Sequence, residues 1–158
     1  MRRAANNPAP RARERERGAV VIEFAIVLPI LALLLGGGIE LGLLARDHQV
    51  LQNAAREGAR FSALPANSIA GAPDAGDAAA IEARIRAHVQ AYLQNEGITT
   101  VPDADITVNQ DYTLMINGIT VRGSEIVIVY AKSLVLPGMN LLADPVNLTG
   151  RAVFRNFY

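Results

Sequence analysis

The sequence predicts an α+β protein: a long N-terminal transmembrane helix that continues into an amphipathic helix, then a second helix and a roughly four-stranded, mostly antiparallel sheet. Two observations predict this class. Apolar residues run almost without charge over residues 19–39 and then recur at helical spacing up to about residue 63. After residue 105, apolar and polar residues alternate instead, which is typical of strands.

The apolar segment is long enough to cross a bilayer. Glu23 is the one charged residue between positions 19 and 39, and a helix of this length spans roughly 31 Å, about the thickness of a hydrocarbon core. Residues 1–18 carry six arginines and two glutamates, and a basic flank stays on the cytoplasmic side. The sequence therefore predicts a cytoplasmic N-terminus and places the acidic remainder outside the cytoplasm.

Glu23 requires an explanation, because a carboxylate at the centre of a membrane helix costs roughly 2.5–3.5 kcal/mol. The segment has three interpretations: a secretory signal peptide, a permanent anchor, or a leader that is cut on the cytoplasmic side of the apolar run. The first fits poorly, since the run is long and no clean Ala-x-Ala site follows it. In the third, cleavage after Gly18 makes Ala19 the new N-terminus, whose protonated amine pairs with Glu23 of a neighbouring subunit.

The stretches RGAVVIEFAIVLP (17–29) and IELGLLARDHQVLQNAAREGAR (39–60) resemble the TadE-like family. Members of this family are minor pilins or pseudopilins of the tight-adherence (Tad, Flp-type, type IVb) pilus. The resemblance implies a pilin-like fold, cleavage by a prepilin peptidase after Gly18 and N-methylation of Ala19. It also implies that Glu23, beside Phe24, acts in assembly.

The same resemblance implies the partners and the location of the protein. The partners are the prepilin peptidase, other pilins or pseudopilins packed against the N-terminal helix, and the inner-membrane Tad assembly machinery. The chain is then a single-pass protein of the bacterial inner membrane with a periplasmic C-terminal domain. Beyond Leu64 no motif matches the family, so the role of that region rests on the N-terminal match.

The long helix is predicted to divide into a transmembrane part, residues 19–42, and an amphipathic extension, residues 43–64, that stops at Pro65. Small residues spaced four apart permit close packing between helices. The alternative is the ordinary tolerance of small residues in such helices. The candidates for this packing are Gly38, Gly42, Ala54 and Gly58.

The remaining chain is predicted to form a loop over residues 65–77 and an extracytoplasmic α+β domain over residues 78–158. Its helix is expected from Ala78 to about Asn95, with Asp77 as the N-cap and Gly97 at the C-terminal stop. Asn117-Gly118 predicts a hairpin turn. The candidate strands are residues 105–110, 112–116, 119–123, 125–136 (the central strand) and 146–157, with a loop over 136–145 between the last two.

Motifs for enzymatic chemistry are absent from the sequence. It contains no zinc-protease, serine-hydrolase or phosphate-loop pattern, and its two histidines lie forty residues apart. It also has no cysteine, which excludes disulfides and thiolate metal sites. The acidic residues around position 105 are interpreted as solvated. We therefore expect no enzyme activity, no cofactor, no bound metal and no nucleic-acid partner.

Three functions follow from these observations. The leading hypothesis is a processed minor pilin or pseudopilin that acts structurally in pilus biogenesis, adhesion or surface attachment. The alternative is an unprocessed bitopic membrane protein whose periplasmic domain binds a partner. A third is a small domain secreted after removal of a signal peptide. Glu23 favours the first of these hypotheses, because neither an anchor nor a signal peptide needs a carboxylate at that depth in the membrane.

Overall fold

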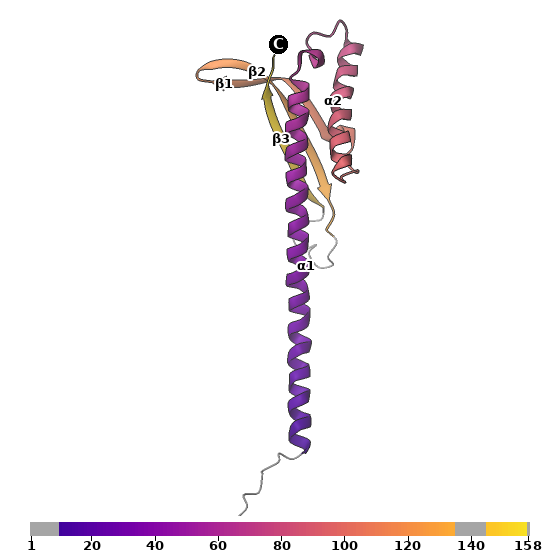
Figure 1. Cartoon of the computed structure of the whole chain (residues 1–158), viewed down its shortest axis with the longest axis vertical. Coiled ribbons are helices and arrows are strands. Elements are labelled where there is room, and N and C mark those ends of the chain that lie inside the picture. Colours follow the sequence, from indigo (N-terminus) through magenta and orange to yellow (C-terminus); the bar gives the residue numbers. More distant parts are fainter. Residues whose placement is uncertain (1–9, 135–144, 158) are drawn as a thin grey trace, which may run out of the picture. The chain divides into compact units, whose positions relative to one another are not determined.

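The computed structural model describes residues 10–134 and 145–157. Helices and strands follow one another in an α+β order, coloured along the chain in Figure 1. The elements are α1 (Pro10–Ser62), η1 (Pro65–Asn67), α2 (Ala75–Asn95), η2 (Asp103–Asp105), β1 (Ile106–Ile116), β2 (Ile119–Lys132) and β3 (Val146–Arg155). The chain divides into two compact units, one ending at Glu40 and the other starting at Leu41, and α1 contributes to both.

The first unit consists of the apolar part of α1. Its large apolar side chains are exposed, from 49% at Leu28 to 67% at Val21 and Ile39. Within the part of the chain that the structure describes, α1 is the one helix long and apolar enough to span a membrane. These side chains therefore need lipid or other protein to remove them from water.

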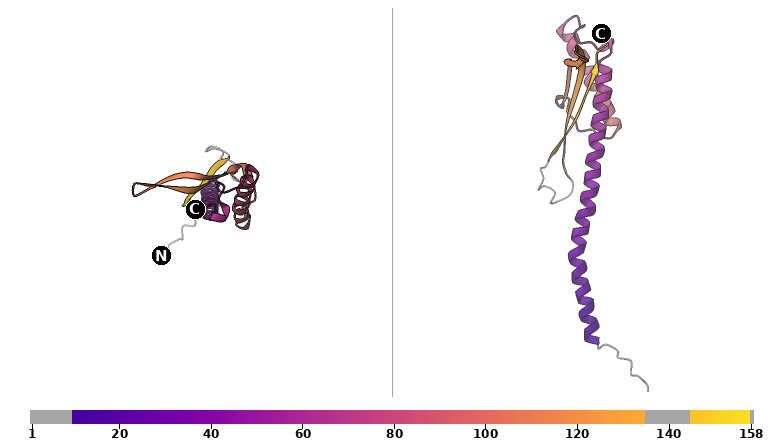
Figure 2. Two further views of the ribbon diagram at one scale, coloured as in Figure 1. Left: turned by 90° about the horizontal axis from the view of Figure 1, so that it is seen from above. Right: turned by 90° about the vertical axis from the view of Figure 1, so that its left-hand side faces the viewer.

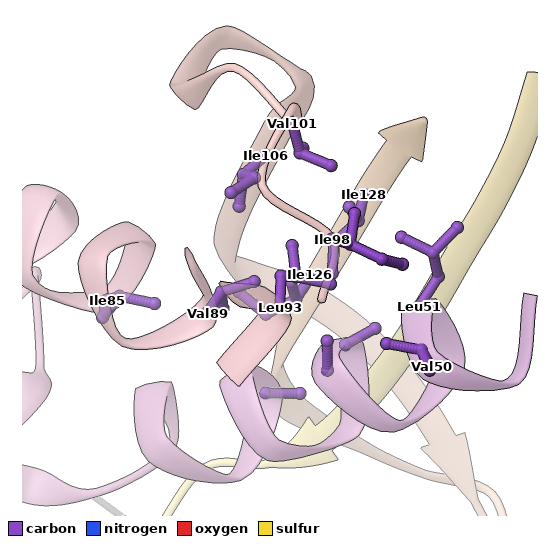
Figure 3. Close-up of a cluster of buried hydrophobic side chains, with 13 residues drawn as sticks. Val50, Leu51, Ile85, Val89, Leu93, Ile98, Val101, Ile106, Ile126 and Ile128 are labelled. Atoms are coloured by element: carbon purple, nitrogen blue, oxygen red, sulfur yellow. The ribbon is translucent and has the colours of Figure 1, made fainter. Parts of the chain in front are cut away.

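In the second unit, α2 and the C-terminal part of α1 lie on one face of the sheet (Figure 2). The helix α1 ends at Ser62, three residues before Pro65, as the sequence predicts. The buried side chains of both helices meet those of β1 and β2 in one cluster, shown in Figure 3. This cluster consists of Val50, Leu51, Ala54, Ala55, Ala59, Ile85, Val89, Leu93, Ile98, Val101, Ile106, Ile126 and Ile128.

Helix α2 begins three residues earlier than predicted. Asp74 is its N-cap and accepts a hydrogen bond from the backbone N–H of Asp77 at 2.8 Å, so Asp77 lies inside the first turn and is not the cap itself. Two aspartates were available, and the earlier one gives the helix an additional turn. The predicted C-terminal stop is confirmed: Gly97 has φ +87°, and the N–H of Ile98 donates to the carbonyl of Leu93 at 2.8 Å.

The sheet has three antiparallel strands in the order β1-β2-β3, and not roughly four. The predicted strands 105–110 and 112–116 are one strand, β1, because the chain continues through a bulge between Asn109 and Tyr112. The predicted hairpin is confirmed: Asn117 and Gly118 have φ angles of 52° and 78°, which a tight turn of this kind requires. The predicted strands 119–123 and 125–136 are also one strand, β2, because the chain stays extended from Ile119 to Lys132, and β2 is central, as predicted for residues 125–136. Most of the predicted loop 136–145 lies outside the described residues.

Helix α1 approaches the sheet closely because two glycines face the contact. A Cβ at Gly150 of β3 would lie 2.6 Å from the carbonyl carbon of Leu51, closer than any side chain tolerates. A Cβ at Gly58 of α1 would overlap Val89 of α2 and lie 3.5 Å from Ile126 of β2. Both positions therefore require glycine for the packing of α1 in this unit.

Candidate functional site

The predicted processing and assembly residues lie in the first unit, on the apolar helix. Gly18, Ala19, Glu23 and Phe24 are all exposed, Phe24 by 64%. Glu23 makes no hydrogen bond or ion pair among the residues that the structure describes, and exposed apolar side chains surround it in the sequence. A carboxylate in this setting is costly in a membrane unless a group from elsewhere pairs with it.

The four small residues predicted to pack helices fall into two groups. Gly38 and Gly42 are exposed, and an added Cβ at either would meet no atom within 4 Å. Ala54 and Gly58 are buried within the second unit. Ala54 belongs to its apolar core, and Gly58 faces Val89 of α2 and Ile126 of β2. Ala54 and Gly58 therefore serve packing inside this chain, which leaves Gly38 and Gly42 as the candidates for contacts with another helix.

A buried polar network that the sequence did not reveal connects the end of α1 with the bulge of β1. The side-chain amide of Gln110 donates to the carbonyls of Ser62 (3.0 Å) and Asn67 (2.6 Å) and to the Ser62 hydroxyl (2.9 Å). Its Oε1 accepts from the backbone N–H of Ile69 at 2.7 Å. The network fixes the chain just after α1 and explains why β1 bulges there.

The C-terminal residues extend this network. Asn156 donates from its side chain to the backbone carbonyl of Gln110 at 3.0 Å and accepts from the Ser124 hydroxyl at 2.7 Å. A cleft of about 490 Å³ lies beside it. The polar atoms of Gln110 and Asn156 already have protein partners, and the described residues contain no group of three metal-ligating side chains. The arrangement therefore supports folding.

The outer face of the sheet carries a charged pair. Arg151 of β3 donates to Glu125 of β2 at 2.6 Å and to the Tyr112 hydroxyl of β1 at 3.2 Å. The hydrogen bond to Glu125, and secondly that to Tyr112, raises the pKa of Arg151, which is charged at every physiological pH in any case. Arg151, Glu125 and Tyr112 thus link all three strands on the face of the sheet opposite to the helices.

A second cleft, of about 380 Å³, lies between α1 and β3. From α1 it is lined by two exposed arginines, Arg56 and Arg60, and from β3 by the segment 152–154. Sequence reasoning missed it, because it depends on how α1 lies beside β3. The signal available in the sequence was the pair of arginines one helical turn apart.

The fold and the exposed helix define a class of protein: an α+β domain joined to one N-terminal apolar helix that could span a membrane. Residues 18–60 match the TadE-like protein family, which confirms the resemblance seen in the sequence. This match lies entirely within α1. It ends two residues before the end of α1, so α2 and the sheet lie outside it. No curated protein and no solved structure matches the chain.

Proposed function

We propose that this protein is a minor pilin or pseudopilin of a Tad (type IVb) pilus and that it acts structurally in pilus biogenesis, adhesion or surface attachment. On this proposal it is a substrate of an enzyme and not itself an enzyme. The observation that carries the proposal is Glu23, a carboxylate with no partner among the described residues. It lies on an exposed apolar helix, five residues after Gly18 and inside the segment that matches the family.

The proposal includes processing and a topology. A prepilin peptidase cuts after Gly18 and removes the basic leader, residues 1–18. Residues 19–42 cross the inner membrane with the new N-terminus on the cytoplasmic side, and residues 43–62 extend the helix. The rest of the chain, which includes α2 and the sheet, lies in the periplasm. The six arginines of the leader support this orientation.

Processing creates a partner for Glu23. The new amine of Ala19 is largely protonated at neutral pH, so it pairs with Glu23 of the neighbouring subunit when helices pack in register. A buried ion pair contributes little net stability because desolvation offsets the attraction, but its loss leaves an uncompensated charge. The pair therefore sets the register of processed subunits. On this proposal, the inner-membrane Tad assembly machinery binds the processed helix, which begins at Ala19.

The experiment is intact mass measurement and N-terminal sequencing of the protein from membranes of cells that carry the matching peptidase. We expect a chain that starts at Ala19, heavier by one methyl group if the terminus is methylated. A chain that keeps residues 1–18 would contradict the proposal and favour an unprocessed bitopic membrane protein. A cut between residues 45 and 66 would favour a secreted domain.

Glu23→Gln tests the register separately from processing. It keeps the shape of the side chain and removes its charge, so we expect normal cleavage and insertion with a loss of most assembled protein. The matched control is Glu96→Gln at the exposed end of α2, which changes the net charge equally. Unchanged assembly in Glu23→Gln, with assembly also normal in the control, would show that the charge pair is not needed.

A further inference from the structure

The outer edge of β3 is the edge that does not pair with β2. Gln52 of α1 contacts it near one end and Ala63, the residue after α1, contacts it near the other, and the edge is open between these two contacts. Near one end, the side chain of Gln52 donates to the carbonyl of Thr149 at 3.3 Å. Near the other, the N–H of Phe157 donates to the carbonyl of Ala63 at 3.3 Å, whereas the N–H of Asn156 points to β2 and donates to the carbonyl of Arg122.

The backbone groups of successive residues point to opposite sides of a strand. The N–H and carbonyl groups of the odd-numbered residues of β3 therefore point away from β2. The N–H and carbonyl groups of Arg151 and Val153 therefore face the open edge, and no described strand pairs with them.

The cleft between α1 and β3 lies along this open edge. Its lining among the described residues comes from those two elements and not from β2, which places it on the outer side of β3. Ala152, Val153 and Phe154 supply its apolar surface, and Phe154 is 36% exposed. The cleft therefore offers both apolar surface and backbone groups that pair with no described residue, which together suit an extended segment.

The charged side chains of the cleft favour an acidic occupant. Arg56 is exposed and makes no hydrogen bond or ion pair within the described part of the chain. Glu57, the acidic residue of the lining, lies 3.7 Å from Arg60 and 3.5 Å from Nε2 of His88. Arg60 is thus the cation paired with Glu57, since Nε2 of His88 makes no hydrogen bond with a described residue, and the positive charge of Arg56 is left to attract a carboxylate.

The strands of this chain are poor occupants. The carboxylates in its described strands are Asp111 of β1 and Glu125 of β2, and each is already paired, with Arg122 at 3.4 Å and with Arg151 at 2.6 Å. The other described acidic residues of the second unit lie in helices, turns or their caps. Among its described residues, a second copy therefore has no extended segment with an unpaired carboxylate to offer.

We propose that the cleft between α1 and β3 binds a short extended segment of another protein, with alternating acidic and apolar side chains. The segment adds to the open edge as a fourth strand and pairs with the backbone of Arg151 and Val153. A carboxylate on it binds Arg56, and the apolar side chains cover Ala152 and Phe154. This inference does not depend on processing after Gly18.

The test uses the full chain in detergent micelles and a labelled peptide of alternating glutamate and valine, with affinity measured by fluorescence anisotropy. Comparison peptides replace glutamate with lysine or carry N-methyl groups along one edge. We expect the acidic peptide to bind at least about tenfold more tightly than either, since one comparison removes the charge attraction and the other removes the strand hydrogen bonds. Its binding should shift the backbone amide signals of Arg151 and Val153.

Arg56→Glu should weaken binding by at least about tenfold, and Arg56→Gln by less. The matched control is Arg122→Glu, which makes the same charge change at an exposed residue outside this cleft and should alter affinity less than about twofold. Dispersed amide spectra establish that each variant is folded. Equal affinity for acidic and basic peptides, amide shifts confined to other residues, no binding of the acidic peptide, or displacement of it by a second copy of the chain would each overturn the proposal.

Discussion

The two parts of α1 use apolar residues in opposite ways. Between residues 20 and 35 the large apolar side chains are about half to two thirds exposed, whereas Leu51, Ala54, Ala55 and Ala59 are fully buried. The first part carries Leu, Ile, Val and Phe on all sides, as a helix does in lipid or among other helices. The second carries small residues on one face, which allows close contact with α2 and the sheet. One helix therefore depends on partners outside the chain at one end and on its own domain at the other.

The segment that matches the TadE-like family, residues 18–60, includes both parts of α1. The sequence AAREGAR at 54–60 places its alanines and glycine in the domain core, while Arg56 and Arg60 stay exposed. Packing inside the chain thus explains the alanines and the glycine of this run, and its charged positions line the cleft beside β3.

The largest effect on stability is expected from Gly150→Ala. The new Cβ would meet the backbone of Leu51, which cannot move aside as a flexible side chain can. We expect a loss of about 3 kcal/mol in the free energy of unfolding of the C-terminal unit, measured by denaturant titration of the full chain in detergent. The matched control, Gly38→Ala, adds a methyl group in open space and should cause no loss. Equal midpoints for the two variants would show that α1 does not approach β3 closely.

Gln110→Ala should destabilise the same unit by about 2 kcal/mol. It leaves the Ser62 and Asn67 carbonyls and the Ile69 N–H without their partner in a buried setting. Thr113→Ala, at an exposed position of the same strand, is the control and should stay within about 0.5 kcal/mol. Thermal or denaturant unfolding measures both. A loss at Gln110 no larger than that at Thr113 would mean that the network does not hold the bulge.

Lys132→Met should cost about 1–2 kcal/mol. It removes the Nζ that lies 2.8 Å from Oδ2 of Asp47, whose residue is only 3% exposed. Adding Asp47→Asn should recover part of the loss, because the buried charge is then gone as well. The exposed pair of Arg122 and Asp111 is the reference and should show a coupling below about 0.5 kcal/mol in the same double-mutant cycle. Simple additivity at Asp47 and Lys132 would contradict the prediction.

Gly42→Leu should have the smallest effect on stability and a clear effect on assembly. The site is open within the chain, so the free energy of unfolding of the C-terminal unit should change by less than about 0.5 kcal/mol. Helices of neighbouring chains that pack on Gly38 and Gly42 would be pushed apart. The yield of assembled protein after membrane cross-linking measures this. Normal assembly of Gly42→Leu would show that this face contacts lipid only.

Local signals in the sequence predicted much of the fold. Asn117-Gly118 defines a turn because its φ angles suit these residues, and Gly97 ends α2 for the same reason. Pro65 marks the end of α1 to within three residues. The start of α2 was wrong because Asp74 and Asp77 are both good caps, and local sequence does not choose between them.

The sequence by itself determined the apolar span, the position of Glu23 and the order of helices and strands, because these depend on residues close together along the chain. The tertiary structure alone decided that β1 is one bulged strand, since its bulge is held by Ser62 and Asn67 from a distant segment. It also decided that Ala54 and Gly58 pack inside the chain and that Arg56 borders an open strand edge. These features arise from contacts between residues roughly 30 to 100 positions apart, and such contacts leave no local periodicity to detect.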